Sequence, residues 1–477
     1  MPNYKKRKLK SQKFLEPKRL LFFVPKILKY GFVYKVSAGL QIDLNTVIKK
    51  TPKGFVEQHL CDHNCSLDCG NYQCPAAFTE NKGADPKSLM SLEEVQKSLK
   101  VALEGLKLAN KLFLEKEFSK YCADFKIPGQ VQDEIRETLK NGGYELNLFG
   151  GNPELHPNFL EIVKNAKEMG WVVTATTTGK KFIYNDNFVR GFLRNPPDLL
   201  AMSADDYEDI NELNELLKMN AEDLKKYWQK ANPLYGQRKK AFESLYVAKI
   251  SKSLKSFPKI LFNIVIHPGN LPHIFKFISA LRQRFPNIII NPYPAQSSFC
   301  YESPVWKTRH LLPLEKVVDY MIQNQTNSRE KNFVSRLHYW LVLKSVFLTK
   351  MSNKDRTKLL SGWGIWSCYK NSGAGRYLQA GSSNIIKKEV FRVGGHPGCF
   401  WNRQTVTEAS KQLWTMDKKQ VVRYLINSKI TLPKTAPKPC PGCIMPRLMF
   451  DGISTELGLS SKLIPAYLKL RKEHYGF

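Results

Sequence analysis

Residues 60–75 read Leu60-Cys61-Asp62-His63-Asn64-Cys65-Ser66-Leu67-Asp68-Cys69-Gly70-Asn71-Tyr72-Gln73-Cys74-Pro75 and place four cysteines within fourteen positions. The gaps between successive cysteines are three, three and four residues. Structural zinc sites usually combine two close cysteine pairs that are distant in the sequence. One short stretch that supplies four thiolates favours an iron–sulfur cluster instead. A closed four-cysteine zinc site is the alternative for the same residues.

The sequence that follows this stretch alternates apolar runs with helical segments, which predicts an α/β fold. Asn158–Met169 and Leu271–Phe285 carry apolar residues at helical spacing and are expected to connect parallel strands. The expected strands are Gly54–Leu60, Glu145–Phe149, Trp171–Thr176, Leu199–Ser203, Ile260–Ile266 and Ile288–Tyr293.

The length of 477 residues predicts one large domain and a smaller one, because single hydrophobic cores rarely exceed about 250 to 300 residues. We expect a basic N-terminal segment over residues 1–50 and a strand-rich domain over residues 51–300. Helical insertions are expected near residues 80–140 and 205–255 of that domain. A helical linker over 301–360 and a cysteine-rich domain over 361–477 would complete the chain.

The chain is strongly basic, with a formal net charge of +32. Residues 1–35 contain 11 Lys and Arg against one acid, Glu16. A field of this sign attracts polyanions, so nucleic acid, an anionic membrane surface and an acidic peptide are candidate partners. A solvated basic face without a partner is the alternative.

The apolar run Leu20–Val24 is too short for a membrane span or for the core of a secretory signal. Ten cysteines fit a reducing compartment if most of them bind metal, which favours a cytoplasmic protein. Lys18–Lys35 mixes cations with apolar residues, which keeps a peripheral membrane location open.

Small and polar residues follow three successive predicted strands. Gly150 and Gly151 follow the second strand, Thr176-Thr177-Thr178-Gly179 ends the third, and Ser203 ends the fourth. Because the carboxyl ends of parallel strands meet at one edge of a sheet, these residues are expected to share one rim. Glycines there let the backbone approach a ligand closely.

The ordered motifs resemble those of radical S-adenosylmethionine (radical SAM) enzymes. That family's cysteine loop follows the first strand, usually as Cys-x3-Cys-x2-Cys, and Asn64–Cys69 is similar to its opening. The resemblance makes Cys65, Cys69 and Cys74 the cluster ligands. The last gap is four residues where the family normally has two, so Cys61, Cys65 and Cys69 form a competing triad.

The glycine pair extends this resemblance. Gly150-Gly151-Asn152-Pro153 is similar to the family's Gly-Gly-Glu-Pro segment, which holds the amino group of the methionine moiety. Asn152 replaces the usual acid, so a charge-assisted hydrogen bond becomes a neutral one. Ser203 and Asp205 fit the family's Ser-x-Asp near the cofactor. The resemblance thus implies cofactor binding by Gly150, Gly151, Asn152 and Ser203.

The resemblance covers residues 55–300 and implies a fold, cofactors and an activity. The fold would be a partial (βα)6 TIM-type barrel. The cofactors would be a [4Fe–4S] cluster and S-adenosyl-L-methionine, with an external electron donor of the flavodoxin or ferredoxin type. Reductive cleavage of S-adenosylmethionine would give a 5′-deoxyadenosyl radical that abstracts hydrogen from a substrate.

A second cysteine set lies near the C-terminus and consists of Cys368, Cys399, Cys440 and Cys443. It resembles the short form of the auxiliary-cluster extension, of the SPASM or twitch type, that follows many radical SAM barrels. The resemblance implies a second iron–sulfur cluster and a substrate that is a peptide or protein side chain or a small-metabolite precursor. A zinc ribbon is the alternative, because Cys-x2-Cys pairs also suit zinc.

A second class of function stays open: a non-catalytic iron–sulfur or zinc protein that binds nucleic acid through its basic surface. Asn152 in place of the acid favours this alternative, whereas the barrel-like alternation of strands and helices disfavours it. The remaining two cysteines, Cys122 and Cys300, are expected to be small buried apolar residues.

Overall fold

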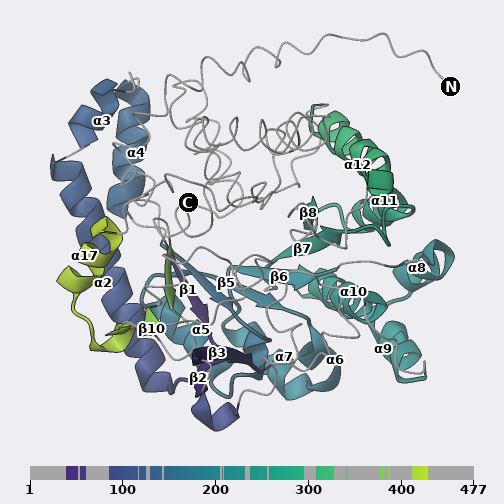
Figure 1. Cartoon of the computed structure of the whole chain (residues 1–477). Coiled ribbons are helices and arrows are strands. Elements are labelled where there is room, and N and C mark those ends of the chain that lie inside the picture. Colours follow the sequence, from purple (N-terminus) through teal and green to yellow (C-terminus); the bar gives the residue numbers. More distant parts are fainter. Residues whose placement is uncertain are drawn as a thin grey trace.

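The protein is described from a computed structural model, shown in Figure 1. The described residues are 39–51, 54–60, 85–116, 118–124, 129–141, 144–204, 207, 209–230, 237–254, 257–294, 308–326, 340, 377–380, 385–386 and 411–427. Within these ranges no helix combines the length and the apolar character needed to cross a membrane.

A parallel sheet forms the centre of the fold. Its six central strands lie side by side in chain order, and each neighbouring pair is parallel. They are β1 (Gly39–Asp43), β4 (Glu145–Phe149), β5 (Val172–Thr177), β6 (Leu199–Ser203), β7 (Lys259–Ile266) and β8 (Ile289–Pro294). Sequential order without reversal is typical of a barrel, whereas a doubly wound sheet reverses its strand order at a switch point. The predicted α/β class and partial (βα)6 barrel are confirmed by this strand order.

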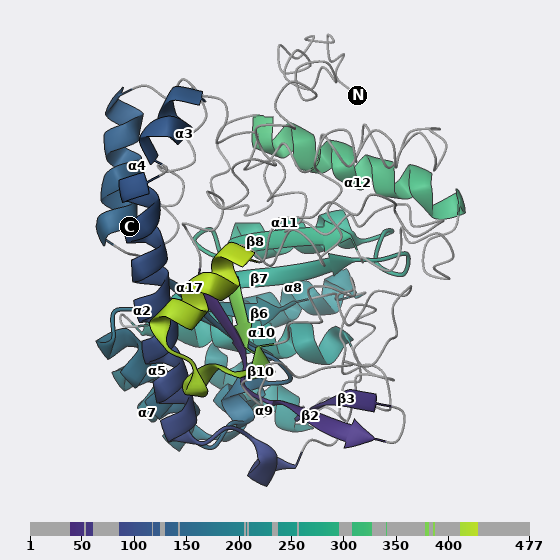
Figure 2. The same ribbon diagram turned by 60° about the vertical axis from the view of Figure 1, so that its left-hand side comes forward.

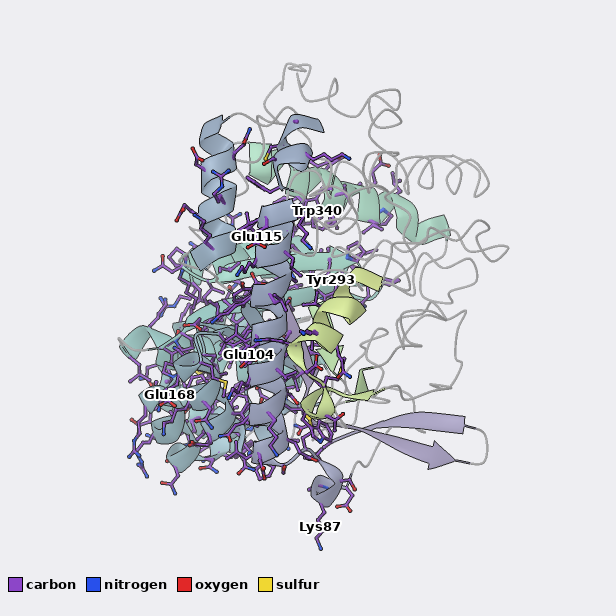
Figure 3. All side chains as sticks on the ribbon, turned by 90° about the vertical axis from the view of Figure 1, so that its left-hand side faces the viewer. Lys87, Glu104, Glu115, Glu168, Tyr293 and Trp340 are labelled. Carbon is purple, nitrogen blue, oxygen red and sulfur yellow. The ribbon has the colours of Figure 1, made fainter. Side chains whose placement is uncertain are left out.

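The prediction that Gly54–Leu60 is the first strand of the barrel is wrong. Gly54–His59 does form a strand, β3, but it pairs antiparallel with β2 (Thr46–Thr51) in a separate two-stranded sheet. The first barrel strand is β1, which precedes this hairpin. Local alternation can identify a strand, but it does not reveal which sheet the strand joins. The hairpin extends away from the barrel in Figures 2 and 3.

The two faces of the sheet differ in composition. One side of each strand, such as Leu146 and Leu148 on β4, is fully buried in the main hydrophobic core beneath the crossover helices. The opposite side carries a small separate apolar cluster of Leu199, Ala201, Leu261 and Ile289. Because side chains alternate along a strand, this second cluster lies on the interior face of the barrel.

Helices connect the strands and fill both insertions. The two predicted crossover helices are confirmed as α5 (Phe159–Glu168) and α11 (Ile274–Arg284). The other connections contain α6 (Lys180–Tyr184), α7 (Asp186–Arg194), α8 (Ile210–Lys218), α9 (Ala221–Lys230) and α10 (Gln237–Ser253). The first insertion contains α2 (Leu92–Lys116), α3 (Phe118–Asp124) and α4 (Gly129–Asn141), and α12 (Thr308–Thr326) follows the last barrel strand.

Cys122 on α3 is buried and forms no disulfide, and burial raises the pKa of its thiol to about 11. The prediction that it is a small buried residue is therefore confirmed. Cys300 lies outside the described residues.

Residues from the C-terminal third join the barrel at the edge of β1. Strand β9 (Tyr377–Ala380) pairs parallel with β1, and β10 (Ile385–Ile386) and β11 (Lys411–Gln412) extend the sheet antiparallel. The following α17 (Lys418–Asn427) packs against α2, as Figure 2 shows. A Cβ on Gly105 of α2 would overlap the side chain of Val421, so glycine permits this close approach. The predicted domain boundaries remain predictions.

Candidate functional site

The base of the hairpin lies against the glycine turn that follows β4. The Leu60 backbone N–H donates to the Asn45 carbonyl at 2.7 Å, and the Leu60 carbonyl accepts from the Asn152 N–H at 3.2 Å. The Asn45 side chain donates through Nδ2 to the carbonyl of Asn152. Since Asn45 closely follows β1, the hairpin returns the chain to the end of the first barrel strand. Leu60 is also the residue directly before Cys61.

Glycine is required at the turn itself. Gly150 and Gly151 have φ values of +82° and +56°, a region that residues with a side chain rarely adopt. A Cβ on Gly151 would overlap the carbonyl oxygen of Leu60 and would lie 3.2 Å from Cβ of Asn45. The absence of a side chain at Gly151 therefore permits the contact with Leu60, the residue before Cys61.

Asn152 connects the turns that follow β4 and β5. Its side chain is buried, with 1% of its surface exposed. Its Nδ2 donates to Thr178 Oγ1 at 3.0 Å, and the Thr178 N–H donates to its Oδ1 at 3.3 Å. Both ends of the amide therefore contact one residue of the neighbouring turn. This pairing could not be predicted from the local sequence, because the two residues are 26 positions apart.

A second connection joins the turn after β4 to the last residue of β5 and involves Glu154 and Thr177, which are both buried. The Thr177 hydroxyl donates to Oε2 of Glu154 and accepts from the Gly179 N–H at 3.0 Å. The Lys181 ammonium donates to the backbone carbonyl of Glu154. Sequence analysis did not identify Glu154 or Lys181; the signal available was an acid two residues after Asn152.

His156 is a structural residue of this turn and not a general base. It is 1% exposed, and its Nδ1 accepts from the Asn158 N–H at 3.2 Å. Its Nε2 must then carry the proton, and it donates to the carbonyl of Met90 at 3.0 Å. Burial lowers the pKa of His156, and the nearby Lys181 cation acts in the same direction. The imidazole is therefore held neutral.

A polar row crosses the interior face of the other half of the barrel. Ser203, Asn263 and Asn291 are partners in register on β6, β7 and β8. Asn291 Nδ2 donates to Asn263 Oδ1 at 2.8 Å, and the Ser203 carbonyl accepts from the Ser244 hydroxyl at 2.6 Å. The row lies one step nearer the carboxyl ends than the apolar interior cluster. Tyr293, labelled in Figure 3, follows two residues later on β8.

Ser203 was predicted from the sequence, whereas Asn263 and Asn291 were not. Asn263 is the only polar residue after Lys259 in the strand Lys259–Ile266, and Asn291 interrupts the apolar strand Ile289–Pro294. A lone polar residue in a run of this kind is a usable signal, because a buried amide in a core strand needs a partner.

The structure leaves the predicted metal ligands untested. Cys65, Cys69, Cys74, Cys368, Cys399, Cys440 and Cys443 lie outside the described residues, as do Cys61 and Asp205. Within the described ranges there is no group of three or more His, Cys, Asp or Glu side chains suited to a metal ion. The ligand assignments therefore remain predictions.

Two buried acceptors at this site fit a ligand that donates hydrogen bonds. Asn147 Oδ1 and Asn45 Oδ1 are buried and have no hydrogen-bond partner among the described residues. Asn147 alternates with the core residues Leu146 and Leu148, so it lies on the interior face of β4. The ammonium, hydroxyl and amino groups of S-adenosylmethionine are donors of the required kind. The residues present are thus compatible with the implied cofactor.

Comparison with known proteins gave structural likenesses only, since no family model and no curated protein matches the chain. Streptococcus suis SuiB bound to S-adenosylmethionine is similar over 89% of this chain and 74% of its own, with 12% identity and a TM-score of 0.45. SuiB bound to the precursor peptide SuiA is similar over 96% and 81%, with 13% identity and a TM-score of 0.43. Native anSMEcpe with bound AdoMet and Cp18Cys peptide is similar over 90% and 98%, with 13% identity and a TM-score of 0.40.

Proposed function

We propose that the protein is a radical SAM enzyme whose catalytic cluster lies at the carboxyl rim of the barrel. The observation that carries this proposal is the position of Leu60. This residue directly precedes Cys61, and its carbonyl accepts a hydrogen bond from the N–H of Asn152 in the glycine turn. The chain therefore contacts the glycine turn at the residue that precedes Cys61. The resemblance puts the family's cysteine loop after the first barrel strand and its glycine segment after the second, and the carboxyl ends of neighbouring parallel strands meet at one rim, which supports this proposal.

In this proposal Cys65, Cys69 and Cys74 hold a [4Fe–4S] cluster, and Gly150, Gly151, Asn152 and Ser203 bind S-adenosylmethionine. When bound, these groups supply the reductive cleavage that generates the 5′-deoxyadenosyl radical for hydrogen abstraction. The chain itself would position the cofactor and exclude water from it. The glycines would let the backbone of the turn approach the cofactor, and the apolar interior cluster would help to exclude water below the rim.

The proposed substrate is a peptide or protein side chain. The support for it is the resemblance of Cys368, Cys399, Cys440 and Cys443 to a short auxiliary-cluster extension. These cysteines would hold a second iron–sulfur cluster, and a flavodoxin- or ferredoxin-like protein would supply electrons. Mass spectrometry of candidate peptides after turnover tests the substrate class. Modification of a small-metabolite precursor alone would contradict the peptide assignment.

The function itself is tested under anaerobic conditions. The protein is reconstituted with iron and sulfide, reduced with dithionite and given S-adenosylmethionine, and 5′-deoxyadenosine is then measured. We expect product and about eight irons per chain for two [4Fe–4S] clusters. Cys69→Ala should abolish product, whereas Cys122→Ala, which changes a buried thiol remote from the cysteine stretch in sequence, should retain it.

The alternative is a non-catalytic iron–sulfur or zinc protein that binds nucleic acid. The net charge of +32 and the absence of the usual acid at Asn152 favour it. In that case the protein would form no 5′-deoxyadenosine and would bind RNA or DNA with an affinity that falls steeply with salt.

A further inference from the structure

Glu154 is a buried acid at the glycine turn whose presence the cofactor resemblance does not explain. It lies in the short 3-10 helix Pro153–Leu155, two residues after Asn152, and 1% of its surface is exposed. A buried carboxylate costs free energy unless hydrogen bonds compensate for its lost hydration. A buried acid at this position therefore points to a specific task.

We propose that Glu154 is a positioning residue that orders the turn after β5 through Thr177 and thereby sets the geometry of the cofactor site. This inference rests on the proposed function and deepens it. The resemblance puts an acid at position 152, whereas the chain has the neutral Asn152 there and an acid at Glu154. We infer that the acid at 154 acts indirectly, through the hydrogen bonds of the neighbouring turn.

The hydrogen bonds of Thr177 fix the direction of its hydroxyl. The Gly179 N–H donates to Oγ1, so a lone pair of the hydroxyl is used and its proton points elsewhere. That proton is donated to Oε2 of Glu154. The carboxylate therefore orients a hydroxyl that in turn holds the backbone of Gly179 at the carboxyl end of β5.

The turn after β5 leaves no room for a side chain at Gly179. Gly179 has φ of +92°, and a Cβ there would lie 2.5 Å from Cε of Met202 and 3.0 Å from Cγ2 of Val247. The Glu154 backbone is itself held by the Lys181 ammonium. The residue is thus fixed through its main chain and acts on the next turn through its side chain.

The two connections differ in their chemistry. Asn152 pairs with Thr178 through neutral amide hydrogen bonds, whereas Glu154 pairs with Thr177 through its carboxyl group. Hydrogen bonds to a charged acceptor are roughly twice as strong as neutral ones. Loss of the charge at Glu154 should therefore loosen the turn even when the shape of the side chain is kept.

The test measures binding of S-adenosylmethionine to the reconstituted full-length protein by equilibrium dialysis. Glu154→Gln keeps the shape and removes the charge, and we expect its Kd to rise about tenfold with iron content unchanged. Thr177→Val should weaken binding similarly, because it removes both hydrogen bonds of the hydroxyl. Glu161→Gln, the same change at an exposed position on α5, is the matched control and should bind as wild type.

A double-variant cycle separates positioning from general destabilisation. If Glu154 acts through Thr177, the double variant should bind no more weakly than Thr177→Val alone, so the two effects are not additive. Thr177→Ser retains the hydroxyl and should restore wild-type binding. The change that S-adenosylmethionine produces in the electron paramagnetic resonance spectrum of the reduced cluster should require about tenfold more cofactor in Glu154→Gln.

The outcomes distinguish two failures. Wild-type protein that holds its clusters but does not bind S-adenosylmethionine would overturn the proposed function and this inference with it. Normal wild-type binding together with a Kd for Glu154→Gln within about twofold of wild type would overturn this inference alone. If Glu154→Gln does not fold, Thr177→Val and Thr177→Ser test the inference instead. Equal affinity of these two variants for S-adenosylmethionine would show that the Thr177 hydroxyl does not position the cofactor site, and would overturn the inference.

Discussion

The two halves of the barrel's carboxyl rim are built in different ways. At the ends of β4 and β5 the functional candidates lie in turns, and side-chain hydrogen bonds from Asn152 and Glu154 connect one turn to the next. At β6, β7 and β8 the candidates Ser203, Asn263 and Asn291 lie within the strands, in register. The first half therefore depends on contacts between loops, whereas the sheet itself positions the second. Substitutions should damage the first half through backbone displacement and the second only locally.

The largest expected effect is that of Gly151→Ala, which would displace Leu60, the residue before Cys61. The new Cβ would overlap the carbonyl oxygen of Leu60, and φ of +56° adds strain. We expect a loss of about 3 to 5 kcal/mol in the free energy of unfolding and the loss of about four irons per chain.

Gly170→Ala is the matched control for that prediction. Gly170 also has positive φ, at +90°, but a Cβ there would meet no atom within 4 Å. It should cost only about 1 to 2 kcal/mol, and the iron content should not change. Urea titration and iron analysis check both variants; equal iron loss in the two would show that backbone strain, and not the contact with Leu60, matters.

The next effect is that of Gly179→Ala, at the other turn of the same half. A Cβ there would overlap the terminal methyl group of Met202, which can move. The φ of +92° would add backbone strain. We expect a loss of about 2 kcal/mol with iron retained and cofactor binding weakened. Urea titration measures the stability, and equilibrium dialysis measures the affinity for S-adenosylmethionine. An unchanged affinity would show that the turn after β5 is not part of the cofactor site.

A smaller effect is expected from Asn291→Ala in the second half. The substitution removes the hydrogen bond to Asn263 Oδ1 but leaves the strand in place. It should cost about 1 kcal/mol in the free energy of unfolding, measured by urea titration, and leave the iron content unchanged. A loss of stability equal to that of Gly151→Ala would contradict the view that the sheet itself positions this half of the rim.

The smallest effect concerns His156 and pH. Burial lowers the pKa of His156 in the folded protein, so the unfolded chain binds the proton more readily. The stability that the neutral imidazole contributes is present above the unfolded pKa of about 6.5 and is lost as pH falls below it. His156→Gln should therefore show a smaller decrease in the free energy of unfolding between pH 7.5 and pH 5.5. An identical decrease in wild type and variant would remove His156 as a cause.

The sequence was most informative where contacts are local or periodic. Glu145–Phe149 and Leu199–Ser203 are strands with the predicted bounds, because apolar runs between turn residues specify buried parallel strands. Strand β1 was missed, since five residues within a basic segment give little periodic signal. The pairing of Asn152 with Thr178 joins separate turns, and nothing in either turn predicts its partner.

The pairing of β9 with β1 has a consequence for synthesis of the chain. Residues 39–43 are made early, whereas their partner residues 377–380 appear more than three hundred residues later. At a synthesis rate of roughly 5 to 20 residues per second, the β1 edge of the nascent sheet stays unpaired for on the order of twenty seconds to a minute before β9 is made. An unpaired strand edge invites pairing with other chains during that interval. Protein made in a heterologous host should therefore benefit from a low expression level, which lowers the concentration of nascent chains, or from chaperones that shield the nascent chain.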